Sequence, residues 1–243
     1  MKMSDLFKDE YAVKARFIPA LLTVIPFGFL IAYPFREYVL SLKQGFEMVA
    51  KCSFYASLIG SIFIVTIFVW VFLVRLAAKF IESIVFKDEL SFPTTQLLMW
   101  SDTYYPKAIK RKIHRRIKED FDVQLSNEDS EEVNPIEAAT KIARVVGRIR
   151  DKVKDGRIVL QYNIHYGIIR NLTVGALFSL PVSFLLVYMG SSNNSMHSAI
   201  DVGIVLSLLY MTVLATSKFT WPFLGKLYAK TLIDEYMSRE WDK

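Results

Sequence analysis

Cysteine, glycine and proline are scarce in this sequence. Its 243 residues include one cysteine, 10 glycines and eight prolines, which excludes a disulfide-stapled, collagen-like or low-complexity chain. The three histidines, His114, His165 and His197, lie far apart and have no cysteine beside them, so we expect neither a metal site nor a cofactor. The sequence also has no phosphate-binding glycine loop and no nucleophile elbow, and we therefore do not expect an enzyme.

Apolar residues are abundant instead, and they are separated from the charged ones. Hydrophobic residues make up 53% of the chain, while the charged fraction of 22% is close to that of soluble proteins. Four apolar runs account for the excess, at residues 17–35, 52–74, 171–189 and 199–216. Each is long enough to cross the roughly 30 Å hydrocarbon layer as a helix. The sequence predicts an all-α membrane protein with four transmembrane helices and a helical cytoplasmic domain between helices 2 and 3.

Lysine and arginine near the ends of these runs indicate the orientation. Residues 1–16 contain four, the segment 79–170 contains 17 and the residues from 218 onward contain five, whereas residues 36–51 contain three and 190–198 none. The positive-inside rule then places both termini in the cytoplasm of a multi-pass membrane protein. The expected parts are a cytoplasmic N-terminus (1–16), helices 1 and 2 (17–78), a cytoplasmic domain (79–170), helices 3 and 4 (171–217) and a cytoplasmic C-terminal tail (218–243).

The segment 79–170 carries its charges in blocks. Residues 107–118 include seven cations and no acid, with apolar residues every three to four positions, a pattern typical of an amphipathic helix with a broad basic face. Seven acids follow between Glu119 and Glu132, and we expect a solvated loop there.

Two further helices are expected in this segment. Asn134 and Pro135 form a helix cap and a first-turn proline, and the helix that they start is predicted to end near Gly156. Residues 157–170 alternate like a strand, but no partner strand is evident, so we favour a helix that continues into the third run.

The basic stretch is the candidate ligand-binding site. Its cations are Lys107, Lys110, Arg111, Lys112, Arg115, Arg116 and Lys118. Three interpretations remain open: binding of an oligonucleotide or cyclic nucleotide, attraction to anionic lipid, and pairing with the acidic stretch that follows.

Polar and small residues within the apolar runs suggest helix association and a pore. Small residues four apart on the second run favour close helix packing; they are Ser53, Ser57, Gly60 and Ser61. The fourth run contains the candidate pore-lining or intramembrane polar residues Asp201, Ser207, Thr212 and Thr216. Because Asp201 lies near the end of its run, interfacial solvation is an alternative explanation for it.

One combination of motifs resembles a known group. The sequence contains Phe92-Pro93-Thr94-Thr95, then Trp100-Ser101-Asp102, the basic stretch, and Tyr166-Gly167 with Arg170-Asn171. Residues 90–175 thereby resemble bacterial membrane proteins with a PTT…WSD stretch and a YGFRRN-like element, although Ile168 and Ile169 replace its aromatic residue and arginine. These proteins are similar to membrane effectors of anti-phage systems, such as the membrane subunit of the Hailong system.

The resemblance implies an oligomeric pore that depolarises the inner membrane. A nucleotide or oligonucleotide made by a partner nucleotidyltransferase would control it from the cytoplasmic domain. Four short spans of one subunit enclose no evident aqueous path, so conduction would require a homo-oligomer in the bilayer. The alternative is a non-conducting scaffold whose basic cytoplasmic helices recruit a soluble partner.

Overall fold

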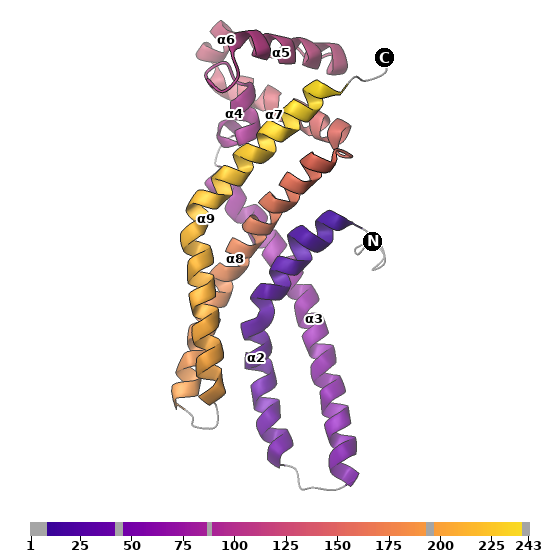
Figure 1. The fold of residues 1–243 in the computed structure, drawn as a ribbon, viewed down its shortest axis with the longest axis vertical. Coiled ribbons are helices and arrows are strands. Elements are labelled where there is room, and N and C mark those ends of the chain that lie inside the picture. The colour runs from indigo at the N-terminus through magenta and orange to yellow at the C-terminus, as the bar shows by residue number, and fades with distance from the viewer. Residues whose placement is uncertain (1–8, 42–45, 87–88, 193–196, 240–243) are drawn as a thin grey trace. The chain divides into compact units, whose positions relative to one another are not determined.

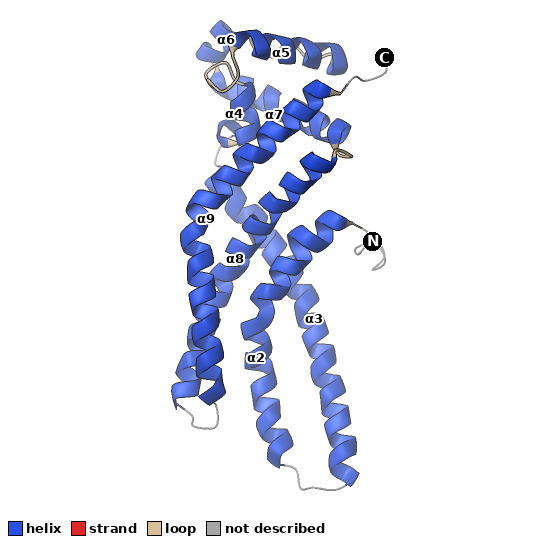
Figure 2. Ribbon diagram, in the orientation of Figure 1, coloured by secondary structure: helices blue, strands red, loops and turns tan. Residues whose placement is uncertain are grey.

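A computed structural model of the protein describes residues 9–41, 46–86, 89–192 and 197–239. These residues are helical apart from short connections, and they include no strand (Figures 1 and 2). The elements in chain order are η1 (Ala12–Phe17), α2 (Ile18–Ser41), α3 (Phe46–Val85), η2 (Glu89–Ser91), α4 (Pro93–Leu98), α5 (Lys107–Phe121), α6 (Glu128–Val133), α7 (Pro135–Val153), α8 (Arg157–Ser192) and α9 (His197–Ser238). The predicted all-α class is confirmed.

Four helices are long and apolar enough to cross a membrane. Their apolar segments are Ala12–Ala32, Gly60–Val85, Arg157–Ser192 and Ser198–Ser238. The prediction of four such helices is therefore confirmed, and so is the helical interpretation of residues 157–170, which open α8. Helices α8 and α9 run well past the apolar runs, since α8 begins at Arg157 and α9 ends at Ser238 with Pro222 inside it.

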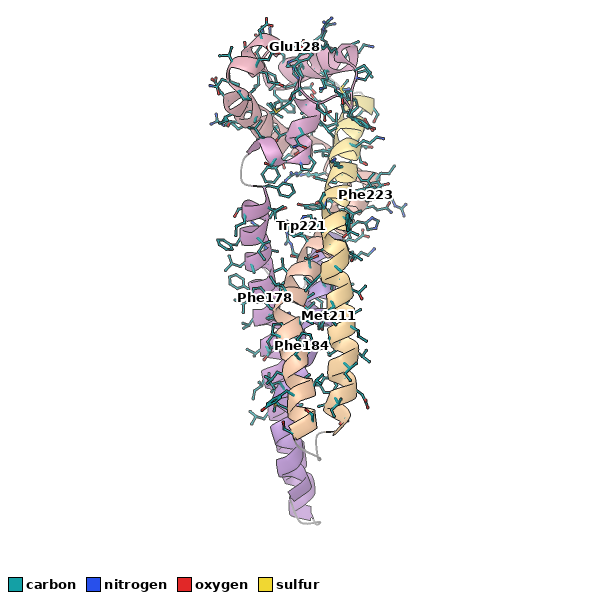
Figure 3. The ribbon with its side chains drawn as sticks, turned by 90° about the vertical axis from the view of Figure 1, so that its left-hand side faces the viewer. Glu128, Phe178, Phe184, Met211, Trp221 and Phe223 are labelled. Atoms are coloured by element: carbon teal, nitrogen blue, oxygen red, sulfur yellow. The ribbon has the colours of Figure 1, made fainter. Side chains whose placement is uncertain are left out.

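The described chain divides into two compact units. The first unit comprises Met1–Lys79 and Gly167–Lys218, and the second comprises Phe80–Tyr166 and Phe219–Lys243. In the first unit, apolar side chains such as Phe178, Phe184 and Met211 are about half exposed (Figure 3). Exposed apolar surface of this kind is expected where the solvent is lipid.

Side chains of α8 and α9 donate hydrogen bonds to the carbonyls that lie four residues before two prolines of α2. A proline has no N–H, so Pro19 and Pro26 cannot donate the usual α-helical hydrogen bond to the residue four positions earlier. Asn171 Nδ2 donates to the Ala15 carbonyl at 2.5 Å, and the Tyr210 hydroxyl donates to the Leu22 carbonyl at 2.8 Å. Both carbonyls thus receive a donor from another helix, which satisfies backbone groups that the two prolines leave without their α-helical donor.

Close helix packing in the first unit centres on Thr23. Trp70 Nε1 of α3 donates to Thr23 Oγ1 at 3.0 Å, and Ser179 of α8 donates to the Thr23 carbonyl. A methyl group at Gly175 would overlap the Thr23 side chain. A glycine and a small hydroxyl side chain therefore allow α2 and α8 to approach each other closely.

The second unit has its own apolar core. Three helices supply most of its buried side chains: Ile113 and Ile117 from α5, Ile142, Val146, Ile149 and Val153 from α7, and Tyr228, Leu232, Ile233 and Tyr236 from α9. The predicted cap of α7 is confirmed, because Asn134 Oδ1 accepts from the Glu137 N–H at 3.2 Å. Ile136, in the first turn of α7, lies outside this core and is 66% exposed.

Two expectations about this part of the chain are corrected. Residues 119–132 are not a continuous solvated loop, because Asn127 caps the short helix α6 and Glu131 within it is buried. Residues 218–238 are not a separate tail. They continue α9, and their Tyr228–Leu232–Ile233–Tyr236 face is buried among α5 and α7.

Candidate functional site

The inward side of α5 contains a lysine in place of an apolar residue. Lys110 is 1% exposed and shares this side with Ile113 and Ile117. Its ammonium group donates to the carbonyls of Met99 and Asp102, with the Trp100 carbonyl 3.4 Å away. Burial lowers the pKa of Lys110, while the nearby charges of Asp102 and Glu131 act to raise it. Lys110 is therefore not on the exposed basic face where the sequence pattern placed it.

Glu131 completes the polar cluster around this lysine. Its carboxylate accepts hydrogen bonds from the backbone N–H groups of Trp100 and Ser101, both at 2.9 Å. Because a buried acid needs partners for both oxygens, these N–H groups explain why an acid from the acidic stretch is buried. The Trp100-Ser101-Asp102 motif is held from two sides, by Lys110 at its carbonyls and by Glu131 at its N–H groups.

His114 and Trp100 pack against each other within the same cluster. Their rings lie 4.8 Å apart in an edge-on arrangement. His114 Nε2 donates to the Leu98 carbonyl at 2.9 Å, and Trp100 Nε1 donates to the Ser126 carbonyl at 2.8 Å. Burial lowers the pKa of His114, despite the bond to Leu98. A neutral histidine in this place supports the loop instead of contributing a charge to the basic face.

Arg116 is also turned toward the protein. It donates to the carbonyls of Met237 and Arg239 and lies over the Tyr236 ring at 5.0 Å. Asp120 accepts from the Tyr236 hydroxyl at 2.7 Å and pairs with Lys152 at 3.1 Å. Burial raises the pKa of Asp120, but these bonds and the nearby cations outweigh it and lower the pKa. Arg116 therefore helps to join α5 to α9.

The remaining cations of α5 point outward. Lys107 pairs with Glu128 at 2.5 Å, with both side chains largely in solvent. Arg111, Lys112, Arg115 and Lys118 are exposed, and the structure records no ion pair or hydrogen bond for their side chains within the part of the chain that it describes. Three of them, Arg111, Arg115 and Lys118, fall in one narrow sector of the helix. We define these four residues as the outer cation strip; they are the part of the predicted site that can meet a ligand.

The polar residues of the fourth apolar run do not share one environment. Asp201, Thr212 and Thr216 are exposed, whereas Ser207 is 4% exposed and its hydroxyl has no hydrogen-bond partner within the described chain. Thr212 and Thr216 donate to carbonyls of their own helix, at Leu208 and Thr212, each at 2.9 Å. Ser207 is thus inside the bundle, and the others lie on its surface.

The small residues of α3 face away from the rest of the subunit. Ser57 and Ser61 are exposed, and a methyl group added at Gly60 would meet no atom within 4 Å. The side chain of Ser53 lies outside the described residues. Packing within the subunit uses Gly28, Gly167, Gly175 and Gly203 instead, where an added methyl group would contact another helix. Sequence spacing alone did not single out these glycines, because each is isolated in its run.

Within the described ranges, no three histidine, cysteine, aspartate or glutamate side chains gather in a way that would hold a metal ion. Comparison with family models, curated proteins and solved structures finds no match. The function is therefore inferred from the residues of this chain.

Proposed function

We propose that this protein is a membrane effector of the anti-phage kind, in which several copies form a pore and a phosphate-bearing ligand controls it. The ligand would be a short oligonucleotide or a cyclic nucleotide bound at the outer cation strip of α5. The observation that supports this proposal is that the cations of α5 fall into an inward group and an outward group. Lys110 and Arg116 are bonded within the fold, whereas four neighbouring cations lack an acidic partner in the described chain. Cations arranged in this way attract polyanions.

The distribution of lysine and arginine supports a cytoplasmic location for the second unit. A ligand made in the cytoplasm would then reach the outer cation strip directly. This orientation also places both termini in the cytoplasm.

Uncovered surface on the first unit supports association of several copies. Only 11% of the most apolar stretch of Gly60–Val85 in α3 is buried within the subunit. The same helix presents Ser57, Gly60 and Ser61 outward, which would allow close contact with a helix of another copy. Asp201, Thr212 and Thr216 on the surface of α9 are the candidate pore-lining residues.

The test is ion flux through liposomes that contain the purified full-length protein, with and without short DNA oligomers or cyclic nucleotides. We expect the ligand to change the flux of the wild type. The double variant Arg111→Glu/Arg115→Glu should weaken the apparent affinity for the ligand roughly tenfold or more, because two phosphate contacts become repulsive. Arg144→Glu/Lys154→Glu is the matched control, since these are exposed cations outside α5. Arg116 is left unchanged because of its contacts with α9.

Three outcomes would contradict the proposal in different ways. A flux that no nucleotide changes would overturn ligand control. Equal effects of the two double variants would remove the outer cation strip as the binding site. No flux under any condition, with correct insertion verified, would favour the scaffold alternative.

A further inference from the structure

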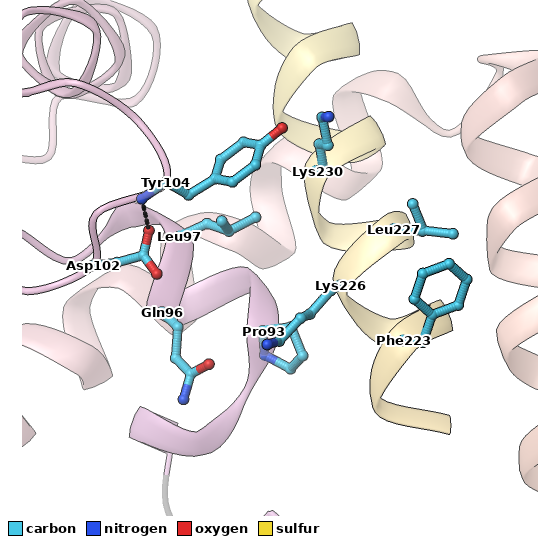
Figure 4. A pocket seen from close by; sticks show the side chains of 9 residues that line it. All are labelled: Pro93, Gln96, Leu97, Asp102, Tyr104, Phe223, Lys226, Leu227 and Lys230. Carbon is cyan, nitrogen blue, oxygen red and sulfur yellow. Dashed lines mark hydrogen bonds between the residues drawn. The ribbon is translucent and has the colours of Figure 1, made fainter. Parts of the chain in front are cut away.

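A cavity of about 330 Å³ lies within the second unit, between α4 with its following loop and α9 (Figure 4). Its volume is in the range typical of small-molecule sites. Its apolar lining comes from both sides, from Pro93 and Leu97 of α4 and from Phe223 and Leu227 of α9. Lys226 and Lys230 stand on α9, on the same helix as Phe223 and Leu227. The cavity therefore combines an apolar surface with two ammonium groups.

The two lysines differ in their surroundings. Lys230 lies over the Tyr104 ring at 5.0 Å, and both lysines are exposed. The structure records no ion pair for Lys226 among the described residues. The one acid of the cavity, Asp102, already accepts from the Tyr104 N–H at 2.8 Å. The lining thus carries one net positive charge, which suits an anion.

The face of α9 that forms this cavity changes from aromatic to basic along its length. Phe219 and Phe223 are 75% and 61% exposed, and Lys226 and Lys230 follow about one and two turns beyond Phe223. At 100° per residue, all four fall within a sector of about 60°. Phe219 also comes directly after the fourth apolar run and Lys218 in the sequence. Aromatic residues followed by lysines beside an apolar run are typical of a membrane–water interface.

We propose that this cavity binds an anionic phospholipid, with its phosphate between Lys226 and Lys230 and its acyl chain along Phe219 and Phe223. Charge complementarity selects an anionic headgroup. The exposed aromatic rings select a ligand with an attached hydrocarbon chain over a free phosphate. The site is separate from the outer cation strip and does not depend on the proposed ligand control.

The test is titration of the full-length protein in a neutral detergent with phosphatidylglycerol or phosphatidylcholine, with bound lipid counted by native mass spectrometry. We expect phosphatidylglycerol to bind more tightly than phosphatidylcholine. Lys226→Gln/Lys230→Gln should weaken phosphatidylglycerol binding about tenfold and leave phosphatidylcholine unchanged. The control Lys112→Gln/Lys118→Gln removes two exposed cations of α5 and should have no effect. Thermal unfolding of each variant shows that it is folded.

A second variant separates a lipid from a free phosphate. Phe223→Ser should reduce the affinity for phosphatidylglycerol several-fold, because it removes apolar contact with the chain. Excess inorganic phosphate should not displace the lipid. Displacement by phosphate, or unchanged binding in Lys226→Gln/Lys230→Gln, would overturn the proposal. Loss of lipid binding only in the α5 variant would move the lipid site to the outer cation strip.

Discussion

The ammonium group of Lys110 lies among backbone carbonyls, and its partners belong to the loop that also holds Asp102. Seven cations on α5 have similar side chains, so composition does not distinguish them. Their positions around the helix do, because Lys110 falls in the sector of Ile113 and Ile117. A buried charge is stable there because several acceptors surround it and Glu131 is near.

Replacing Lys110 should destabilise the second unit. Lys110→Met fills the space with an apolar side chain but removes the ammonium donor from the carbonyls of Met99 and Asp102. We expect a loss of about 2–4 kcal/mol in the free energy of unfolding, measured by chemical denaturation in detergent with tryptophan fluorescence. Lys112→Met, at an exposed position on the same helix, should change it by less than about 0.5 kcal/mol. Equal effects of the two variants would contradict the structural role of Lys110.

His114 should make the stability of this unit depend on pH. Burial keeps its folded pKa below the ordinary value of 6.5. Below pH 6.5 the unfolded chain therefore binds a proton that the folded chain does not, and stability is lost as the pH falls toward the folded pKa. Above pH 6.5 none of this stability is lost.

The check on His114 compares thermal unfolding at pH 7.5 and 5.5. In His114→Gln the drop in melting temperature between these two values should be smaller than in the wild type. His165→Gln, at an exposed histidine, should keep the wild-type drop. A wild-type drop in His114→Gln would show that other groups cause the acid sensitivity.

The residues that carry the candidate site were only partly predictable from the sequence. The basic stretch was identified, but its division into inward and outward cations depends on how the Trp100 loop folds against α5. Glu131 could not be distinguished from the six other acids of its stretch. Its burial depends on two N–H groups about 30 residues away in the chain, and no local pattern encodes that contact.

At the scale of whole elements, α2 depends on its neighbours for backbone hydrogen bonds. Tyr210 donates to the Leu22 carbonyl, which lacks its α-helical donor because residue 26 is a proline. The bond should therefore contribute more to stability while Pro26 is present than when the N–H of residue 26 is restored. This dependence can be measured because the two residues lie on different helices.

A double-mutant cycle tests the pairing of Pro26 with Tyr210. Tyr210→Phe should cost about 1 kcal/mol in the wild-type background. In Pro26→Ala, the N–H of residue 26 is restored and can donate to Leu22, so the same substitution should cost clearly less. The measurement is unfolding in mixed micelles by SDS titration. Tyr188→Phe, at a tyrosine that is 69% exposed, is the control. Equal costs of Tyr210→Phe in the two backgrounds would disprove the coupling.

Local signals predicted most of the elements. The charge-free runs predicted the apolar helices, and Asn134 with Pro135 predicted the start of α7. The C-terminal part of α9 was missed because its charged residues suggested a tail. Yet Tyr228, Leu232 and Tyr236 recur every four positions, which is the spacing of a buried helical face. The sequence could not predict the helix contacts at the glycines or the side chains that donate to the carbonyls preceding the prolines. Both depend on which helices meet.

At the scale of the whole molecule, two kinds of glycine have different roles. One kind allows helices to pack within a subunit, and the other lies where helices of different copies would meet. Gly175 lies where α8 meets Thr23 of α2, so a side chain there must disturb the subunit. Gly60 lies beside the exposed Ser57 and Ser61, and a methyl group at this glycine would meet nothing. The Cβ of a larger residue at Gly60 therefore meets no atom of its own subunit, and we expect the main effect on contacts with another copy.

Gly60→Leu should weaken oligomers and leave the subunit folded. The leucine removes the close approach that small residues permit between helices of neighbouring copies. We expect chemical crosslinking in detergent and in liposomes to give mainly monomers, with an unfolding transition like that of the wild type. Val69→Leu, half exposed on the opposite face of α3, should leave the crosslinked species unchanged, whereas Gly175→Leu should lower the unfolding transition. If Gly60→Leu assembles as the wild type does, this face of α3 is not the contact between copies, and a pore would have to be built through other helices.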